Sequence, residues 1–331
     1  MKNLRWGILG AGKIAGHFAH DLHRTAGCEL IGIGSHSQER ADTWADEHGA
    51  QRGFGSYEAL LDEGKPDVVY VATRHPQHCA ATLLCLERGI PVLCEKPLAI
   101  NGAEVRQMIE TAKTNDTFLM EALWTRFLPS FVRAMELVDR GALGEIQAVR
   151  ADFGFRKEFD PKSRLFDAAK AGGALLDIGI YPLLLAHFVL GPPGEITAHA
   201  ALAPTGVDVD TGILLNYDSG QMAHLHATLR AHTSCDGFIY GSKANIHLHP
   251  RWHEARALTL SFHDDRPDEQ FDFDEMFGDC YGYTFEIQHV MDCLRKGLKE
   301  SPLIPLDFSR RLMASMDEIR HQIGVRYPGL E

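Results

Sequence analysis

The chain has 331 residues, of which 45% are hydrophobic and 24% charged, and its formal net charge is −12. This length and composition are sufficient for a large buried core and favour two domains. The negative charge argues against a nucleic-acid-binding protein, because surfaces that face phosphates are basic.

We expect a cytoplasmic protein that is not bound to a membrane. No uninterrupted apolar stretch reaches the roughly 18–20 residues that cross a bilayer. Residues 1–6 lead directly into the first predicted strand, so we expect no signal peptide. The 7 cysteines include no C-x-x-C pair, which is typical of free thiols in a reducing compartment.

The first third of the chain alternates predicted strands with predicted helices. Strands of this kind, separated by helices of about ten residues, are typical of β-α-β units. We therefore predict an α/β fold, with a Rossmann-type doubly wound parallel sheet forming a dinucleotide-binding domain at residues 1–122. The strands are expected at residues 4–9, 29–34, 67–73 and 92–94, and the helices at residues 14–22, 38–48, 78–88 and 102–115.

Strand-like runs dominate after residue 122, where we predict a second domain at residues 123–331. Turns such as Asp218-Ser219-Gly220 between these runs indicate an α+β domain with a large open, mostly antiparallel sheet. The long apolar segment 172–190 is interrupted by Gly, Pro and polar residues, so we predict that it is not a membrane span. The strands are expected at residues 146–155, 195–202, 211–217, 221–229, 237–240, 244–248 and 257–262, and the helices at residues 129–140, 283–296 and 307–323.

A glycine-rich turn, Gly10-x-Gly12-x-x-Ala15, follows the first predicted strand. In a dinucleotide-binding motif, Gly10 permits the tight turn, Gly12 lets the backbone approach the pyrophosphate, and Ala15 takes the close-packing position. Lys13 and Ile14 begin the next helix, whose N-terminal N–H groups bind phosphates. The motif therefore predicts a nucleotide site at the start of the chain.

The second predicted strand ends in Ser35-His36-Ser37, with Arg40 one helical turn later. An NAD-binding chain usually has an Asp or Glu here for the ribose 2′-hydroxyl, and the first acidic residue is Glu39. Hydroxyl groups and a guanidinium suit a 2′-phosphate better. We therefore predict NADP, with NAD as the second choice. The alternative is that Ser35 and Ser37 only cap the following helix.

The chemistry is predicted from Glu95-Lys96-Pro97 and from Asp177-x-x-x-Tyr181. Lys96 ends a strand of the nucleotide-binding half, where it can lie beside the nicotinamide. Hydride removal from a carbinol needs a base near the hydroxyl. A nearby ammonium favours the phenolate of Tyr181, and Asp177 orients Lys96 or binds a substrate hydroxyl. The alternative is a buried structural tyrosine and a solvated lysine.

The 18 histidines prompt a search for a metal site. Two pairs, His224-x-His226 and His247-x-His249, would each share one face of a strand. A zinc site needs three or four ligands, and neither pair has a third at recognisable spacing. We predict no metal, and we expect these histidines on a strand surface.

Several runs of this chain resemble the glucose-fructose oxidoreductase, inositol dehydrogenase and rhizopine catabolism (Gfo/Idh/MocA) family. The similarity spans nearly the whole chain and is strongest to a subfamily of dimeric enzymes that oxidise trans-dihydrodiols or D-xylose with NADP. That subfamily often has Arg in place of His36, whereas many other relatives have His in place of Tyr181. The runs are the glycine-rich turn, Glu95-Lys96-Pro97 and residues 75–78, 118–127, 171–181 and 293–302.

The resemblance implies a function for both domains. It implies Lys96 and Tyr181 as the catalytic pair, Trp124 and Arg126 near the substrate, and a cis bond before Pro97. It also implies a homodimer formed through the sheet of the second domain, which would bind the substrate. Trp124 has the alternative of being a core residue. Further cofactor contacts are predicted at Thr73, His75, His78 and Glu95.

The leading hypothesis is therefore an oxidoreductase that transfers a hydride between NADP and a secondary hydroxyl of a sugar, polyol or trans-dihydrodiol. A non-catalytic nucleotide-sensing regulator on the same fold is the alternative. Short-chain dehydrogenases are excluded, because their Tyr-x-x-x-Lys would need Lys where this chain has Leu185. The sequence does not determine the physiological substrate or direction.

Overall fold

The computed structural model describes residues 3–331, so the first two residues of the predicted domain 1–122 lie outside the described part. The chain divides into two compact units. The first unit comprises the chain up to Phe127 together with Phe277–Arg310, and the second comprises Leu128–Met276 together with Arg311–Glu331. The division of roles between a cofactor domain and a substrate domain stays a prediction.

The first unit contains a six-stranded sheet in the order β3-β2-β1-β4-β5-β6, and all of its pairs are parallel. The chain moves outward from β1 in one direction and then from β4 in the other. This confirms the predicted Rossmann fold, although the short strands β3 and β6 were not anticipated. The strands are β1 (Leu4–Leu9), β2 (Cys28–Gly34), β3 (Gly53–Phe54), β4 (Val68–Val71), β5 (Val92–Glu95) and β6 (Leu119–Ala122).

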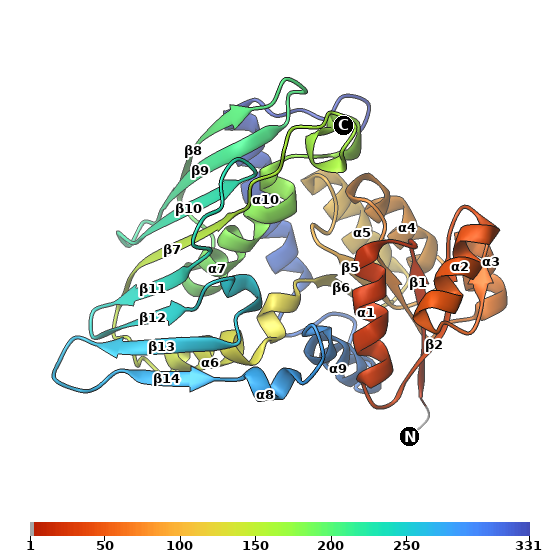
Figure 1. Cartoon of the computed structure of the whole chain (residues 1–331), viewed down its shortest axis with the longest axis horizontal. Helices are drawn as coiled ribbons and strands as arrows, with labels where there is room; N and C mark the ends of the chain where they lie inside the picture. The colour runs from red at the N-terminus through yellow and green to blue at the C-terminus, as the bar shows by residue number, and fades with distance from the viewer. Residues whose placement is uncertain (1–2) are drawn as a thin grey trace. The chain divides into compact units, whose positions relative to one another are not determined.

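Helices cover this sheet, and Figure 1 shows α1 and α2 in red and orange beside β1 and β2. Strand β4 is buried along its whole length, as expected for a parallel strand covered on both faces. The helical elements are α1 (Lys13–Arg24), α2 (Gln38–His48), α3 (Tyr57–Ala59), η1 (Leu60–Gly64), η2 (His75–Gln77), α4 (His78–Leu86), α5 (Gly102–Thr114), η3 (Trp124–Phe127) and α9 (Tyr283–Arg295).

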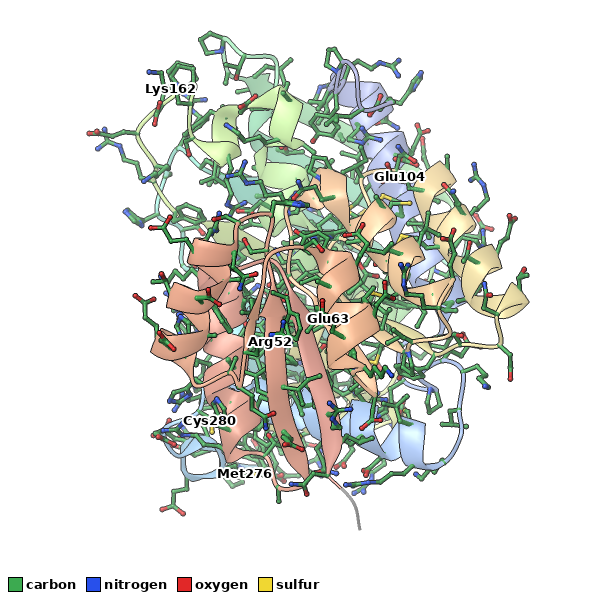
Figure 2. The ribbon with its side chains drawn as sticks, turned by 90° about the vertical axis from the view of Figure 1, so that its right-hand side faces the viewer. Arg52, Glu63, Glu104, Lys162, Met276 and Cys280 are labelled. Atoms are coloured by element: carbon green, nitrogen blue, oxygen red, sulfur yellow. The ribbon has the colours of Figure 1, made fainter. Side chains whose placement is uncertain are left out.

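Local contacts explain where these elements begin. At α5 the side chain of Asn101 accepts the N–H of Glu104 at 2.9 Å, and the Glu104 carboxylate accepts the N–H of Ile100 at 3.2 Å. This is a variant of the capping box, and Glu104 is labelled in Figure 2.

Arg52 and Glu63, also labelled in Figure 2, form an exposed ion pair at 2.8 Å. Such a surface pair contributes little stability.

The second unit contains an eight-stranded sheet in the order β14-β13-β12-β11-β7-β10-β9-β8. All neighbours are antiparallel except β7 and β10, which pair in parallel. The prediction of a mostly antiparallel open sheet is confirmed. The strands are β7 (Ile146–Gly154), β8 (Glu195–Leu202), β9 (Asp208–Asn216), β10 (Met222–Thr228), β11 (Gly237–Gly241), β12 (Ala244–Leu248), β13 (Ala257–Phe262) and β14 (Glu269–Asp272).

One face of this sheet is covered by helices. Along β10, Ala223 and Leu225 are buried whereas Met222 and His224 are exposed, so the strand separates a core face from an outer face. Helix α7 packs on β7, β10 and β11, beside the sheet in Figure 1. The helical elements are α6 (Pro129–Asp139), η4 (Arg164–Phe166), η5 (Ala168–Lys170), η6 (Leu175–Gly179), α7 (Ile180–Leu190), η7 (Trp252–Glu254), α8 (Asp274–Phe277) and α10 (Leu306–Ile323).

The apolar segment of the second unit forms its core. The helical stretch Ala168–Leu190 is long and apolar enough to cross a membrane by length and composition alone. In the structure, 83% of its most apolar window is buried inside the fold. That burial is typical of a core helix and agrees with the expectation from its Gly, Pro and polar residues.

Candidate active site

The glycine-rich turn at the end of β1 has the geometry that a bound nucleotide requires. Gly10 has a φ of +104°, and a Cβ there would lie 2.7 Å from the carbonyl oxygen of Ala72, so a larger residue would not fit. A Cβ added at Gly12 would meet nothing within 4 Å. The turn is therefore tight on its inner side and open on the side where the motif predicts the pyrophosphate.

The N-terminus of α1 differs from those of α2 and α5. Its N-cap residue, Gly12, makes no capping hydrogen bond, and its first turn contains no acidic residue. Ser37 and Asn101 cap the other two helices through their side chains. The first N–H groups of α1 thus lack a side-chain acceptor, which is the arrangement that binds phosphate. Lys13 is the first residue of α1, and Ala15, in the first turn of the same helix, is fully buried.

The end of β2 carries the residues predicted to contact the ribose. The Ser37 hydroxyl accepts the N–H of Arg40 at 3.3 Å, so the capping interpretation is right for this serine. The Arg40 guanidinium donates to the carbonyl oxygen of Ala11 at 2.5 Å and thereby reaches the glycine-rich turn. The His36 ring lies 4.5 Å from the ring of Tyr57, and Ser35 is buried. Arg40 thus joins the segment after β2 to the glycine-rich turn after β1, at the end of the sheet where the motif predicts the nucleotide.

His78 is used within the fold. Its Nδ1 lies 2.8 Å from the carbonyl oxygen of Pro97, and its Nε2 lies 3.2 Å from that of Thr73. Burial lowers the pKa of His78 to about 4, so the ring is neutral and has a single N–H. The shorter distance assigns this proton to Nδ1, which then donates to Pro97. His78 thus supports the loop that carries Lys96 by donating to Pro97, while its other ring nitrogen lies near the carbonyl oxygen of Thr73. His75 lies between Thr73 and His78 along the chain, in η2.

Lys96 stands directly after β5, and its bond to Pro97 is cis, as the resemblance suggested. The carboxylate of Glu95 accepts the Lys96 backbone N–H at 3.1 Å. Its other oxygen accepts the hydroxyl of Tyr70 from β4. The Glu95 side chain therefore holds the backbone of the residue predicted to be catalytic.

Trp124 and Arg126, the predicted substrate contacts in the first unit, lie in the 3-10 turn η3. The indole ring of Trp124 stacks on Tyr283 of α9, with centroids 5.0 Å apart and planes 19° apart. Trp124 is only 7% exposed, whereas Arg126 is partly exposed. The packing fits the core alternative for Trp124, and its contact with substrate stays a prediction.

Asp177 and Tyr181 lie in the second unit, on consecutive helical segments. Asp177 belongs to the π-helical turn η6, and Tyr181 to the first turn of α7. The sequence predicted one regular helical face, whereas the π turn is wider than an α turn. Single π turns of this kind occur frequently at functional sites.

Each of these two residues has partners from distant elements. Asp177 accepts from both terminal nitrogens of Arg164, at 2.8 and 3.4 Å. The Tyr181 ring lies 5.6 Å from Phe153 and 5.1 Å from His253, whose rings stack on one another at 4.0 Å. Sequence reasoning missed Arg164, Phe153 and His253, because no spacing or periodicity links them to the helix.

The histidine pairs lie on the sheet of the second unit. His226 is 2.7 Å from Asp210, and His247 is 2.7 Å from Asp236. Within residues 3–331, no group of three or more His, Cys, Asp or Glu side chains is placed to hold a metal ion. His226 and His247 thus pair with carboxylates on a partly exposed strand surface, whereas His249, just after β12, contacts the hydroxyl of Thr259 at 2.8 Å.

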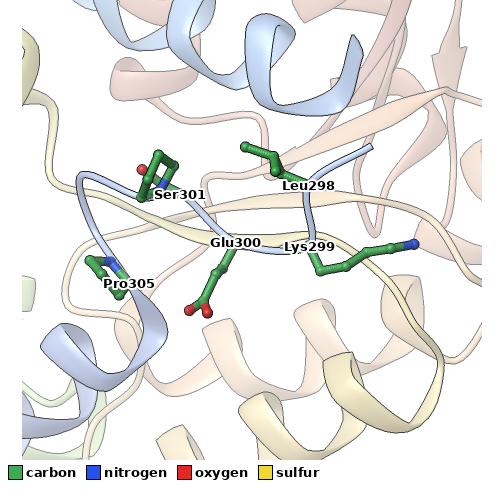
Figure 3. A pocket seen from close by; sticks show the side chains of 6 residues that line it. Leu298, Lys299, Glu300, Ser301 and Pro305 are labelled. Atoms are coloured by element: carbon green, nitrogen blue, oxygen red, sulfur yellow. The ribbon is translucent and has the colours of Figure 1, made fainter. Parts of the chain in front are cut away.

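A pocket of about 330 Å³ is formed by residues 298–305 of the first unit (Figure 3). Two of its polar side chains bind the backbone of the same segment. The Glu300 carboxylate accepts the N–H of Leu306 at 2.7 Å. The Ser301 hydroxyl likewise accepts the N–H groups of Leu303 and Ile304 at 3.1 Å. None of the predicted site residues lines this pocket.

The parallel sheet and its glycine-rich turn define the class of protein, a dinucleotide-binding protein with a Rossmann fold. The model of an oxidoreductase family with an NAD-binding Rossmann fold matches residues 4–123, and that of the GFO/IDH/MocA C-terminal domain matches residues 131–247. The chain therefore belongs to the Gfo/Idh/MocA oxidoreductase family.

Curated relatives match along the full chain. A trans-1,2-dihydrobenzene-1,2-diol dehydrogenase from Homo sapiens is 37% identical over 330 residues, covering 98% of each chain. The protein of the same name from Xenopus tropicalis is 35% identical over 329 residues, covering 98% of this chain and 99% of its own.

Solved structures share the fold at lower identity. Levoglucosan dehydrogenase, solved with NADH and levoglucosan, is 21% identical with a TM-score of 0.88 over 99% of this chain and all of its own. An aldose-aldose oxidoreductase from Caulobacter crescentus is 24% identical with a TM-score of 0.86 over 97% of each chain. A 3-ketoreductase from Actinomadura kijaniata, solved with NADP, is 24% identical with a TM-score of 0.84 over 97% of this chain and 98% of its own. At these identities the likeness shows the fold alone.

Proposed function

We propose that this protein is an NADP-dependent dehydrogenase that oxidises a secondary hydroxyl of a trans-dihydrodiol, a sugar or a polyol. The observation that carries the proposal is the support of Lys96, whose loop is held by Glu95 and His78 at the end of a Rossmann strand. The full-length similarity to trans-dihydrobenzenediol dehydrogenases favours a dihydrodiol as the first substrate to test. The levoglucosan and aldose enzymes among the structural neighbours make sugars the second class.

The proposed roles follow from the chemistry of the residues. The nicotinamide ring of the cofactor, when bound, supplies the hydride acceptor. The Lys96 ammonium stabilises the phenolate form of Tyr181, and this phenolate takes the proton of the substrate hydroxyl and becomes a neutral phenol. Asp177, oriented by Arg164, accepts a hydrogen bond from a second substrate hydroxyl. Trp124 and Arg126 complete the substrate contacts in this proposal.

We propose NADP rather than NAD on the basis of the charge at the end of β2. Arg40 lies at the glycine-rich turn, and Ser35-His36-Ser37 contains no carboxylate that would repel a 2′-phosphate. Thr73, His75 and Glu95 border the nicotinamide side in the same proposal, with His78 supporting the loop. A cytoplasmic location fits this cofactor and remains part of the proposal.

We also propose a homodimer formed through the outer face of the eight-stranded sheet. A groove of about 630 Å³ runs over this face and is lined by residues of β7, β8, β9 and β10. Leu214 on β9 lies opposite His224 on β10, next to the exposed Met222. Apolar side chains at the centre of a polar face are typical of an interface. Leu214→Arg should give a monomer in light scattering, and an unchanged mass would contradict this interface.

The test of the function is nicotinamide absorbance with a trans-dihydrodiol and with D-xylose, each offered NADP and NAD. We expect NADP-linked turnover with at least one substrate and a kcat/KM at least tenfold lower with NAD. No turnover with any pair, in a protein that still binds NADP, would favour the nucleotide-sensing regulator.

A further inference from the structure

A buried group of polar side chains lies under the loop that carries Lys96, entirely within the first unit. It comprises Tyr70 on β4, Glu95 at the end of β5 and Glu286 on α9. Tyr70 and Glu286 are fully buried, and Glu95 is 8% exposed. The roles proposed so far use neither Tyr70 nor Glu286.

Tyr70 reaches Lys96 through Glu95. The Tyr70 hydroxyl donates to one oxygen of the Glu95 carboxylate, and the Lys96 backbone N–H donates to the other at 3.1 Å. Two donors on one carboxylate stabilise its ionised form. The Tyr70 ring stacks on Phe18, with centroids 3.7 Å apart and planes 13° apart. The hydroxyl is thus fixed by the core and in turn fixes Glu95.

Burial raises the pKa of Tyr70 well above its usual value, and the Glu95 charge raises it further. Tyr70 therefore keeps its proton and remains a donor throughout the working range of pH.

Glu286 has no such donors. Neither of its carboxyl oxygens has a hydrogen-bond partner in the part of the chain that the structure describes. Placing an ionised carboxylate in the interior without donors costs several kcal/mol. Burial, and then the charge of Glu95, raise the pKa of Glu286 well above its usual value. Both effects favour the uncharged form of the Glu286 carboxyl group.

A third carboxyl group, Glu121 on β6, belongs to the same surroundings. It accepts the N–H of Leu98 at 2.8 Å, and burial raises its pKa to about 7. Both Glu95 and Lys96 act on it electrostatically, so a change of activity near pH 7 can come from Glu121. A test of Tyr70 and Glu286 has to keep Glu121 unchanged.

We propose that Tyr70 is a positioning residue for Lys96, that it acts by anchoring the Glu95 carboxylate, and that Glu286 completes the group as an uncharged acid. This inference rests on the catalytic role of Lys96 in the proposed function. Ionised Glu286 would place a second negative charge beside Glu95 and weaken its hold on the Lys96 backbone. The uncharged form leaves Glu95 bound to its two donors.

The first experiment is a double-mutant cycle between Tyr70→Phe and Glu95→Gln. We expect Tyr70→Phe to lower kcat about tenfold, the effect of losing one hydrogen bond to a charged acceptor, with little change in KM for NADP. Glu95→Gln should lower kcat further, and adding Tyr70→Phe to it should have no additional effect. Additive losses, or a kcat within twofold of wild type for Tyr70→Phe, would overturn the positioning role.

Tyr217→Phe is the matched control, because the Tyr217 hydroxyl donates to the carbonyl oxygen of Gly191 in the second unit. It should lower Tm about as much as Tyr70→Phe and leave both kcat and its pH profile unchanged. A kcat loss in both variants would mean that Tyr70 acts only through stability. The Lys96→Met variant is measured in the same experiment. If Lys96→Met stays active, the proposed function fails. If Lys96→Met is inactive and the losses from Tyr70→Phe and Glu95→Gln are additive, only the positioning role of Tyr70 fails.

The second experiment tests Glu286 without using activity. A carboxyl group whose pKa is raised in the folded state holds its proton there and loses it on unfolding, so stability falls as pH rises above about 4.3. Glu286→Gln removes this effect. We expect the variant to have a higher Tm than wild type at pH 8 and the same Tm at pH 4, and to lose an infrared band of a protonated carboxyl group. A lower Tm at pH 8 with the band unchanged would show that Glu286 is ionised.

Discussion

The two units hold their predicted site residues by different means. In the first unit, the residues stand at or shortly after the carboxyl ends of parallel strands, and hydrogen bonds between side chains and backbone groups hold this region together. His78 donates to the carbonyl oxygen of Pro97, Glu95 accepts the Lys96 N–H, and Arg40 donates to Ala11. In the second unit, a helix carries Asp177 and Tyr181, and side chains from other elements fix both.

This difference has consequences for substitution. A hydrogen bond to a backbone group survives most changes to the side chain of the residue that offers that group. The Lys96 loop should therefore keep its shape when Lys96 itself is replaced. The second unit depends on an ion pair with Arg164 and on the rings of Phe153 and His253. Orientation there should be lost when one partner is removed.

Lys96→Met should have the largest effect, a fall in kcat of about 10³-fold or more, because it removes the charge beside the reacting hydroxyl. The fold and NADP binding should persist, since the loop is held by backbone contacts. Steady-state kinetics and calorimetric titration of NADP measure both. Lys113→Met, at an exposed position of α5, is the control. Undiminished turnover of Lys96→Met would exclude its catalytic role.

Tyr181→Phe should lower kcat about 10²- to 10³-fold, because it removes the proton acceptor. The ring, which contacts Phe153 and His253, is retained, so Tm should change by only a few degrees. Kinetics over a range of pH, together with thermal unfolding, separate the two effects. A kcat close to wild type would assign the proton transfer to another group.

Arg40→Ala should weaken NADP binding about 30-fold and NAD binding by less than threefold, since only NADP has a 2′-phosphate to pair with the guanidinium. Calorimetric titration with each cofactor measures this difference. Arg106→Ala, at an exposed position of α5, serves as the control. Equal losses for both cofactors would mean that Arg40 supports only the turn through Ala11.

Arg164→Ala should lower kcat/KM about tenfold, because Asp177 loses the partner that orients it. Arg164 is half exposed, so the effect on stability should be small. Arg164→Lys keeps the charge without the two-nitrogen contact and should recover only part of the activity. Full activity of Arg164→Ala would show that Asp177 is oriented by other groups.

The smallest effect concerns stability alone. Burial lowers the pKa of His187 to about 4, so the folded protein holds the neutral ring whereas the unfolded chain takes up a proton near pH 6.5. Stability is therefore lost as pH falls from about 6.5 towards 4, by about 2 kcal/mol at pH 5 from this residue. His187→Gln should flatten the dependence measured by urea unfolding at pH 7 and pH 5. An unchanged slope would mean that His187 is charged in the fold.

Much of the first unit could be predicted because its signals are local. The apolar run at residues 4–9, the glycines at 10 and 12 and the helix after them specify a strand, a turn and an anion site within about fifteen residues. The same holds for Ser37, which caps α2 three residues before Arg40. The short strands β3 and β6 escaped prediction, and the two residues of β3 carry too little pattern to be recognised.

The sequence by itself determined the alternation of strands and helices, the nucleotide turn and the positions of Lys96, Asp177 and Tyr181, because each depends on neighbours along the chain. Only the tertiary structure decided that Tyr70 and Lys96 share the Glu95 carboxylate and that Arg164 binds Asp177. It also decided that Glu286 finds no donor among the described residues 3–331. These contacts join residues brought together by sheet pairing and helix packing. Burial at these contacts removes water and thereby favours the uncharged form of a side chain. This effect depends on the tertiary structure and cannot be predicted from spacing along the sequence.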